Sequence, residues 1–358
     1  MAELQEAGEQ NAQQHGDDRS RVEWLWEDPG AGAQLARSLL LPASALFGAA
    51  AHARNYLYDH HLLPVRTPRI PALSVGNVSV GGTGKTPVSS WLALQLQARG
   101  AHPAIVMRGY GDDEPLVHAR LAPSVPVVVE SNRFEGIERA ASQGADVAVL
   151  DDAFQHRGVA RVADVVLISA DARSATERLL PSGPYREGMS ALRRASLVIV
   201  TRKAAAQNRA RAAAARAALM APGVPIAIIQ LALDSVHTMD GASVPLASLR
   251  GSRVLAIAGV ANAAAFGAQL SQAGVTVRLR AFPDHHPFTE MDARSLAGSL
   301  SSGEIPICTL KDAVKLAPLW PREAATIGYV SQAVIVDENG SAIDAILELV
   351  NRARLRQL

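Results

Sequence analysis

The sequence predicts an α/β fold in which helices cover both faces of a parallel β-sheet. Short apolar segments alternate with helical segments between residues 67 and 224, and the alternation resumes in a shorter stretch at 225–358. A glycine-rich loop joins the first apolar segment to the helix that follows it. We therefore expect a core domain at 67–224 and a smaller α/β lobe at 225–358.

Length and composition agree with a globular chain of this kind. The chain has 358 residues, which corresponds to about two domains. Hydrophobic residues make up 48% and charged residues 19%, and the net charge of +1 argues against a nucleic-acid-binding protein. The single cysteine, Cys308, excludes an intrachain disulfide and a multi-cysteine metal site. We expect a monomer without a nucleic-acid partner.

The N-terminal region divides into two parts. Residues 1–22 are polar and predict a disordered tail. Residues 23–66 contain the apolar run Leu39–Ala51, which is 13 residues long, whereas a spanning helix needs about 20. A helix with an apolar face and basic or aromatic flanks can lie in a membrane interface, and the alternative is a core helix packed on the domain. The flanking side chains are Trp24, Trp26, Arg37, Arg54 and Arg66.

Apolar runs and turn residues then define the elements of the core domain in order. Strands are expected at Arg69–Val80, His102–Gly109, Val125–Glu130, Asp146–Asp152, Ala163–Ala170 and Ala195–Arg202. Helices are expected at Pro87–Gly100, Glu138–Ala145 and Arg202–Gly223. In the smaller lobe, Arg253–Phe282 reads as strand, glycine turn, helix and strand, and a strand–helix pair ends the chain.

The glycine-rich loop has the composition of a phosphate-binding loop. The pattern G-x-x-x-x-G-K-[ST] is met at every position except the first, where Ser79 replaces glycine. Backbone N–H groups at the start of a helix bind phosphate, the side chain of Lys85 would reach the β- and γ-phosphates, and the Thr86 hydroxyl would bind Mg²⁺. A plain glycine turn is the alternative, which the run G-T-G-K-T between strand and helix disfavours. The expected nucleotide-binding residues are Ser79, Val80, Gly81, Gly82, Thr83, Gly84, Lys85 and Thr86.

Acidic and basic clusters follow several of the other strands. Asp151 and Asp152 end an apolar strand, and one of the two carboxylates would hold Mg²⁺ directly or through water. A capping role would explain one aspartate but not readily two. The segments "RGYGDDEP", "GPYREG" and "DHH" are weaker signals, although an aspartate–histidine pair beside a phosphate site can deprotonate a hydroxyl group.

The ordered set of motifs resembles the tetraacyldisaccharide 4'-kinase family, the lipid A 4'-kinases of Gram-negative bacteria. The resemblance runs from about Leu35 to Leu316, and its order is more specific than any single motif. Members of the family commonly have Thr or Ser at the position of Ser79. The motifs are "VGNVSVGGTGKTP", "RGYG", "DEP", "LDDAFQHR", "GPYRE", "AGVAN", "FPDHHPFT" and "TLKDAVKL".

The resemblance implies a fold, a reaction and a location. It implies a nucleotide-binding core of the P-loop NTPase type, a second lobe, and an N-terminal amphipathic helix that contacts the membrane. It implies transfer of the γ-phosphoryl group of ATP, with Mg²⁺, to the 4'-hydroxyl of tetraacyldisaccharide 1-phosphate. The enzyme would be peripheral on the cytoplasmic face of the bacterial inner membrane.

The resemblance also implies roles for individual residues. Asp113 and His285 match the pair that activates the acceptor hydroxyl, although Asp112 is an alternative to Asp113. Lys85 is the third residue with an expected catalytic role. The expected metal ligands are Thr86, Asp151, Asp152 and Glu187, and the expected substrate or phosphate contacts are Arg108, Gln155, His156, Arg186 and Asp284.

A different class of function remains open at this point. Regulatory ATPase or GTPase switches of the partitioning or metal-insertion type share the "GG-x-GKT" loop and peripheral helices. Their loops usually carry a second lysine directly before the glycines, where this chain has Val80. A switch would hydrolyse ATP without a lipid acceptor, which separates the two functions experimentally.

Overall fold

The computed structural model describes residues 24–109, 113–172 and 177–357. The tail predicted at 1–22 lies outside these ranges. The described residues form two compact units. The core unit comprises residues 38–231 and 334–358, and the small unit comprises 232–333 together with the described part of the N-terminal segment up to residue 37. The chain passes from one unit to the other within strands β7 (Ile226–His237) and β12 (Gly328–Glu338).

The core unit is built on a parallel sheet, as predicted. Its strands lie in the order β7-β6-β5-β1-β4-β2-β3, and every neighbouring pair is parallel. Strands β1 and β4 are buried along their whole length because helices cover both faces of the sheet. The strands are β1 (Ala72–Asn77), β2 (Pro103–Met107), β3 (Val127–Val129), β4 (Val147–Asp151), β5 (Ala163–Ser169) and β6 (Leu197–Arg202).

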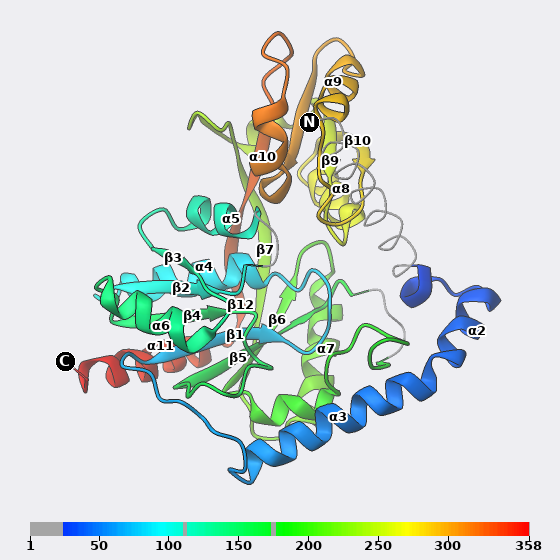
Figure 1. Ribbon diagram of the computed structural model, residues 1–358. Helices are drawn as coiled ribbons and strands as arrows, with labels where there is room; N and C mark the ends of the chain where they lie inside the picture. Colours follow the sequence, from blue (N-terminus) through cyan, green and yellow to red (C-terminus); the bar gives the residue numbers. More distant parts are fainter. Residues whose placement is uncertain (1–23, 110–112, 173–176, 358) are drawn as a thin grey trace, which may run out of the picture. The chain divides into compact units, whose positions relative to one another are not determined.

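Helices pack on the two faces through alternating strand residues. Val149 of β4 belongs to the apolar cluster under α4 (Lys85–Gln97), and the next residue, Leu150, belongs to the cluster under α6 (Arg133–Ser142) (Figure 1). Helix α7 (Gln207–Met220) lies on the same face as α6. This alternation confirms the predicted α/β fold class. The unit also contains α5 (Asp113–Leu121) and η1 (Met189–Arg194).

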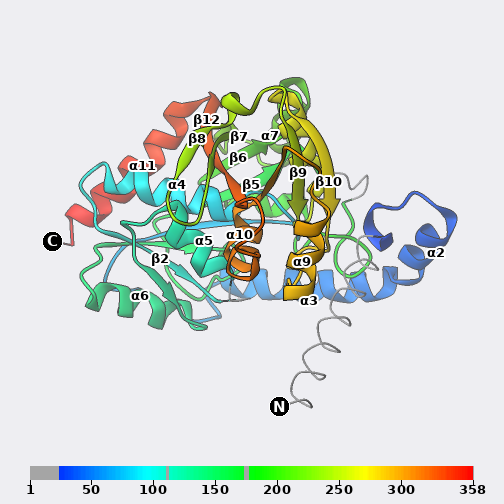
Figure 2. The same cartoon turned by 90° about the horizontal axis from the view of Figure 1, so that it is seen from above.

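The C-terminal helix belongs to the core unit. Helix α11 (Gly340–Leu355) packs along α4 (Figure 2), and Ile343, Leu347 and Val350 are buried in the same cluster as Leu92 of α4. The segment was predicted to belong to the smaller lobe, whereas its apolar face packs on α4 in the core unit.

The small unit repeats the α/β arrangement on a smaller scale. Its strands lie in the order β10-β9-β11-β12 and are parallel, and β8 (Ser243–Pro245) pairs antiparallel with β7. The remaining strands are β9 (Arg253–Ala258), β10 (Thr276–Ala281) and β11 (Glu304–Thr309). The helical elements are α8 (Ala263–Gln272), α9 (Glu290–Gly298), α10 (Leu310–Leu316), η2 (Leu246–Leu249) and η3 (Ala317–Leu319).

Two helices, α2 (Ala31–Leu39) and α3 (Leu41–Asp59), form the N-terminal region. Within α3, all of which the structure describes, Ser44 is the one buried residue. Ser44 Oγ donates to Leu179 O at 3.1 Å and accepts from Ser182 N at 3.0 Å. At Gly48, one turn later, an added Cβ would lie 2.7 Å from Leu179 Cδ1, so this face of α3 approaches the core unit closely.

The described ranges contain no helix with the length and apolar character that crossing a membrane requires. This agrees with the expectation drawn from the short apolar run at Leu39–Ala51. Several large apolar side chains of α3 are nevertheless exposed.

Candidate functional site

The glycine-rich loop leaves β1 and enters α4 through a left-handed residue. Gly84 has φ +84°, and an added Cβ would lie 2.4 Å from Leu231 Cδ1. Both the backbone conformation and the close approach therefore require glycine. Lys85 follows as the first residue of α4, so the loop delivers its lysine at the N-terminus of a helix, where anions bind.

Buried hydrogen bonds hold the loop between two strand ends. Thr83 is buried, and its hydroxyl accepts from Asn77 Nδ2 of β1 at 2.9 Å. Its carbonyl accepts from Thr201 Oγ1 of β6 at 2.9 Å. Lys203, just after β6, donates to the Gly82 carbonyl at 3.2 Å. Side chains and backbone at the ends of β1 and β6 therefore hold the loop in place.

The "GPYREG" segment runs beside the loop. Val80 N donates to Pro184 O at 2.7 Å, and Ser79 forms an isolated antiparallel bridge with Tyr185. Arg186 N donates to Val78 O at 2.8 Å. Backbone pairing thus carries Arg186 to the phosphate loop, although the two segments are about a hundred residues apart in the sequence.

Lys85 and Arg186, both predicted to contact phosphate, lie beside the carboxylate of Asp152. Arg186 Nη1 donates to both carboxylate oxygens of Asp152, at 2.8 and 2.9 Å. Lys85 Nζ lies 3.8 Å from Asp152 Oδ1. All three side chains are partly exposed, so a phosphate group can reach the two cations. The structure thus brings Lys85, Asp152 and Arg186 together.

The neighbouring aspartate has a different environment. Asp151 is 3% exposed, accepts from Ser89 Oγ at 2.6 Å, and lies 3.3 Å from His118 Nε2. Burial raises the pKa of Asp151, but the hydrogen bonds from His118 and Ser89 and the positive charge of Lys85 outweigh it, so the pKa lies below its usual value. Asp151 is therefore a buried carboxylate with both oxygens engaged, and Asp152 is the accessible one.

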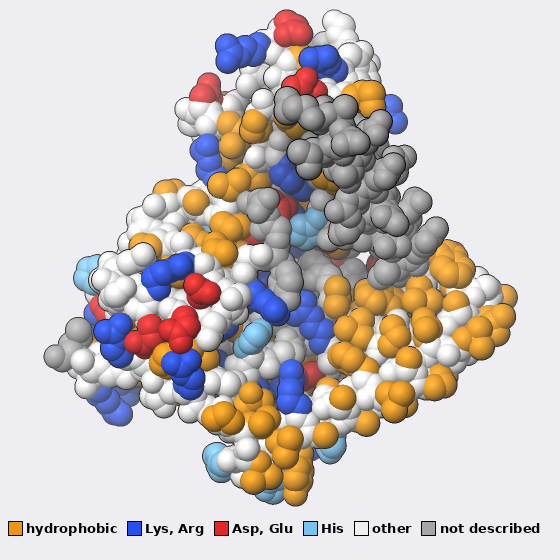
Figure 3. Space-filling view, viewed as in Figure 1, with side chains coloured by type: hydrophobic (Ala, Val, Ile, Leu, Met, Phe, Trp, Pro, Cys, Tyr) orange, Lys and Arg blue, Asp and Glu red, His pale blue; other side chains and the backbone are white. Residues whose placement is uncertain are grey.

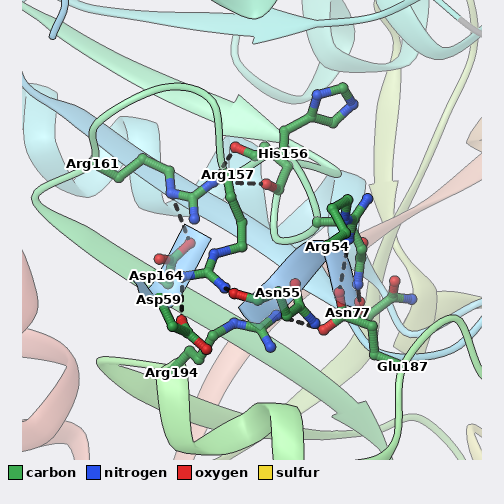
Figure 4. A network of polar contacts seen from close by, with 12 residues as sticks. Arg54, Asn55, Asp59, Asn77, His156, Arg157, Arg161, Asp164, Glu187 and Arg194 are labelled. Carbon is green, nitrogen blue, oxygen red and sulfur yellow. Dashed lines mark hydrogen bonds and ion pairs between the residues drawn. The ribbon is translucent and has the colours of Figure 1, made fainter. Parts of the chain in front are cut away.

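Glu187 lies in an arginine cluster away from these cations. Its buried carboxylate forms ion pairs with Arg54 of α3, at 3.1 Å, and with Arg194 of η1 (Figure 4). Nearby, Arg157 pairs with Asp59 of α3 at 2.6 Å. Glu187 thus joins α3 to η1 within the core unit. Across the described ranges, no three His, Cys, Asp or Glu side chains gather as a metal-binding group.

The other predicted contacts of the core unit lie around the ends of β1, β2 and β4. Gln155 Nε2 donates to Asn77 O at 2.8 Å, at the entry to the loop. The His156 side chain points away from the arginine cluster in Figure 4. Burial, together with the positive charges of Arg133 and Arg108, lowers the pKa of His156. Arg108, at the end of β2, is exposed.

The predicted acid–base residues lie in different units. Asp113 is the first residue of α5 and is 5% exposed, whereas the alternative Asp112 lies outside the described residues. His285 lies in the small unit with φ +60°, and its backbone N donates to Gly259 O at 3.2 Å. The pairing of Asp113 with His285 therefore stays a prediction.

A lysine joins the predicted pair of the small unit. Lys311 Nζ lies 2.6 Å from His285 Nε2 and donates to Asp284 Oδ1 at 3.0 Å. The next residue, Asp312, is buried and accepts from Gly259 N at 3.0 Å. The "AGVAN", "DHH" and "TLKD" motifs therefore meet where β9, β10 and β11 end, the edge at which parallel sheets bind ligands.

Sequence reasoning missed several of these polar residues. Lys311 lies in the "TLKDAVKL" motif. Thr201 and Lys203 lie in "TRK", at the end of an apolar strand, where polar residues often line a ligand site. No local pattern marks the others, because their partners are distant in the sequence. The residues without an assigned role beforehand are Ser89, Ser90, His118, Arg194, Thr201, Lys203 and Lys311.

Comparisons with known proteins identify the family of the chain. The family model described as tetraacyldisaccharide-1-P 4'-kinase matches residues 36–113 and 112–351. The tetraacyldisaccharide 4'-kinase of Anaeromyxobacter dehalogenans strain 2CP-C is 40% identical over 348 residues, covering 88% of this chain and 89% of that protein. The enzyme of the same name from Rhodopseudomonas palustris strain BisB5 is 34% identical, covering 93% and 98%.

A solved structure is similar over both units. The crystal structure of LpxK from Aquifex aeolicus in complex with ATP has a TM-score of 0.70 and 28% sequence identity. The similarity covers 89% of this chain and 99% of that one. It confirms the predicted P-loop NTPase-like fold and supports ATP as the nucleotide.

The family match decides between the two classes of function left open by the sequence. It extends through the small unit, so the resemblance is not limited to the nucleotide-binding loop that regulatory switches share. The lipid-kinase prediction is therefore confirmed and the switch alternative is not favoured. The chain belongs to the tetraacyldisaccharide 4'-kinase family and is an ATP-dependent kinase of lipid A biosynthesis.

Proposed function

We propose that the chain transfers the γ-phosphoryl group of ATP to the 4'-hydroxyl of tetraacyldisaccharide 1-phosphate, with the loop Ser79–Thr86 as the phosphate cradle. The observation that carries the proposal is the family match through both units. The loop supports it with a preformed backbone and with Lys85 at the start of α4.

Lys85 and Arg186 are proposed to bind the phosphate oxygens of ATP. In the structure both cations contact Asp152, so a γ-phosphate competes with that carboxylate for them. Their charges would stabilise the charge that spreads over the transferred group in the transition state. The acceptor oxygen forms a bond to the γ-phosphorus while the bond to the leaving ADP oxygen breaks. His285, oriented by Asp113, is proposed to take the hydroxyl proton.

The oxygen donors near the loop fit a magnesium ion. Mg²⁺ prefers hard oxygen ligands, and the half-buried Thr86 hydroxyl and the accessible Asp152 carboxylate are of that kind. Bound Mg²⁺ would neutralise charge on the β- and γ-phosphates. We propose Thr86 and Asp152 as direct ligands, because their oxygens are accessible from the loop, whereas the carboxylates of Asp151 and Glu187 are buried.

Acceptor-dependent transfer tests this proposal. With γ-labelled ATP, Mg²⁺ and tetraacyldisaccharide 1-phosphate in detergent micelles, we expect label in the lipid, and no transfer once a chelator removes Mg²⁺. Asp152→Asn should raise the Mg²⁺ concentration required for half-maximal rate, whereas Asp59→Asn, in a pair on α3, should not. Labelled inorganic phosphate without labelled lipid would contradict the kinase assignment.

The exposed face of α3 is proposed to bind the inner-membrane surface on the cytoplasmic side, from which the acyl chains of the acceptor are reached. The helix contacts the core unit through Ser44, Gly48 and Arg54, and its large apolar side chains remain exposed. Figure 3 shows hydrophobic side chains gathered over α3. A core helix would bury them, so an interfacial helix is the better interpretation. The exposed apolar residues of α3 are Leu41, Leu46, Phe47, Tyr56 and Leu57.

Leu46→Glu should weaken membrane binding. Leu46 is 74% exposed on α3, so the charge costs little folding stability but opposes insertion into the lipid interface. We expect at least about a tenfold loss of cosedimentation with vesicles of phosphatidylethanolamine and phosphatidylglycerol, the loss that about 1.4 kcal/mol produces. Leu219→Glu is the matched control, since Leu219 is 76% exposed on α7. Equal losses in the two variants would contradict the assignment of α3.

A further inference from the structure

A buried chain of hydrogen bonds lies between α4, α5 and β4. Ser90 Oγ lies 2.8 Å from His118 Nδ1, and His118 Nε2 lies 3.3 Å from Asp151 Oδ2. Ser89 Oγ donates to the other oxygen, Asp151 Oδ1, at 2.6 Å. All four side chains are at most 3% exposed. No step of the proposed chemistry uses Ser89, Ser90 or His118.

The donors and acceptors of this chain are matched. An ionised carboxylate only accepts hydrogen bonds, so His118 Nε2 carries the proton that it donates to Asp151. Nδ1, the other ring nitrogen, forms the contact with the Ser90 hydroxyl, which can both donate and accept. The arrangement satisfies each of these buried groups, and removal of one member leaves another without its partner.

The elements that this chain joins carry the proposed phosphate and proton machinery. Helix α4 begins with Lys85, β4 ends at Asp151 next to Asp152, and α5 begins with Asp113. His118 is the member of the chain that comes from α5, and it bonds to both other elements.

Helix α5 depends on such contacts because it is short. It has nine residues, and isolated helices of this length are marginal in water. Its buried residues are Asp113, Val117 and His118, so the His118 hydrogen bonds lie on the face that carries Asp113.

We propose that His118 is a positioning residue for phosphoryl transfer: the Ser90–His118–Asp151 chain fixes α5, and with it Asp113, relative to Lys85 and Asp152. The proposal rests on the proposed catalytic role of Asp113. His118 touches neither ATP nor acceptor in this role, and acts by holding the first turn of α5 in place.

A double-mutant cycle between Ser90→Ala and Asp113→Asn tests the proposal. Ser90→Ala removes one hydroxyl and frees His118 from α4 while keeping the phosphate loop. If the chain acts through Asp113, Ser90→Ala should lower kcat about tenfold in the wild type and less than about twofold in Asp113→Asn. ATP affinity and Tm are measured for each variant, and ATP affinity should change little.

The other outcomes separate the two hypotheses. If Asp113→Asn lowers kcat and Ser90→Ala lowers it by the same factor in both backgrounds, His118 does not act through Asp113 and the positioning proposal is wrong. If Asp113→Asn alone leaves kcat unchanged, the role proposed for Asp113 fails, and the positioning proposal fails with it. Equal losses of ATP affinity and kcat in Ser90→Ala would indicate a disturbed phosphate loop and would also overturn the proposal.

Variants of His118 and a matched serine complete the experiment. His118→Gln keeps an amide donor for Asp151, whereas His118→Leu removes it, so the glutamine variant should retain more of kcat. Ser182→Ala is the control, because Ser182 is fully buried in the same unit and, within the described ranges, its hydroxyl has one weak hydrogen bond, to the Leu179 carbonyl at 3.5 Å. We expect wild-type kcat for Ser182→Ala; a loss as large as that of Ser90→Ala would overturn the proposal.

Discussion

Lys85→Ala is expected to lower kcat for lipid phosphorylation by about 100- to 1,000-fold, the loss typical for removal of one charge-stabilising donor. Lys85 is the first residue of α4, and its Nζ lies 3.8 Å from the Asp152 carboxylate, beside Arg186. Without it, one of the two cations at the end of the loop is missing when charge develops on the γ-phosphoryl group. The measurement is transfer from γ-labelled ATP at saturating acceptor.

A charge-preserving variant shows whether geometry matters as well as charge. Lys85→Arg keeps the positive charge but replaces a compact ammonium group by a planar guanidinium, so we expect an intermediate kcat. Tm values close to that of the wild type would show that both variants are folded. If folded Lys85→Ala retained kcat within about threefold of the wild type, Lys85 could not contact the transferred group.

Gly84→Ala should abolish ATP binding by deforming the loop. The φ of +84° costs an alanine about 1–2 kcal/mol, and its Cβ would lie 2.4 Å from Leu231 Cδ1 in the core. Leu231 is fully buried, so this contact is relieved either by a new position of its side chain or by a shift of the loop beside the anchors of Thr83. We expect at least a 100-fold loss of ATP affinity, about 2.7 kcal/mol, measured by equilibrium titration.

Gly100→Ala is the matched control for this variant. Gly100 follows the same helix and has φ +81°, but an added Cβ meets no atom within 4 Å. It should therefore lose stability through its backbone alone and keep wild-type ATP affinity. If Gly84→Ala and Gly100→Ala bound ATP equally well, the contact with Leu231 would have no role in shaping the loop.

Local patterns were sufficient for the sheet and the phosphate loop. The strands are continuous apolar runs because both faces of the sheet are covered, and the loop motif fixes its own place between strand and helix. No helix was predicted at α5, although Asp113, Glu114 and Pro115 are residues that favour a helix N-terminus. Gly109 and Gly111, just before these residues, are more typical of a loop.

Long-range contacts could not be predicted in the same way. His118 bonds to residues 28 and 33 positions away, and Glu187 pairs with Arg54 across 133 positions. Neither residue has a local pattern that distinguishes it from a surface side chain. The apolar face of α11 was visible in the sequence, but its packing on α4 depends on a chain path that returns to the core unit.

Arg186 and Glu187 are adjacent in the chain, and both backbone N–H groups donate to Val78 O. The side chain of Arg186 extends to Asp152 at the phosphate loop, and that of Glu187 extends to Arg54 of α3. Consecutive Cα atoms are about 3.8 Å apart, so this dipeptide links the proposed lipid-facing helix to the phosphate site over a short distance, in addition to the contacts that Ser44 and Asp59 make. A residue inserted between Arg186 and Glu187 would move one of the two side chains away from its partner.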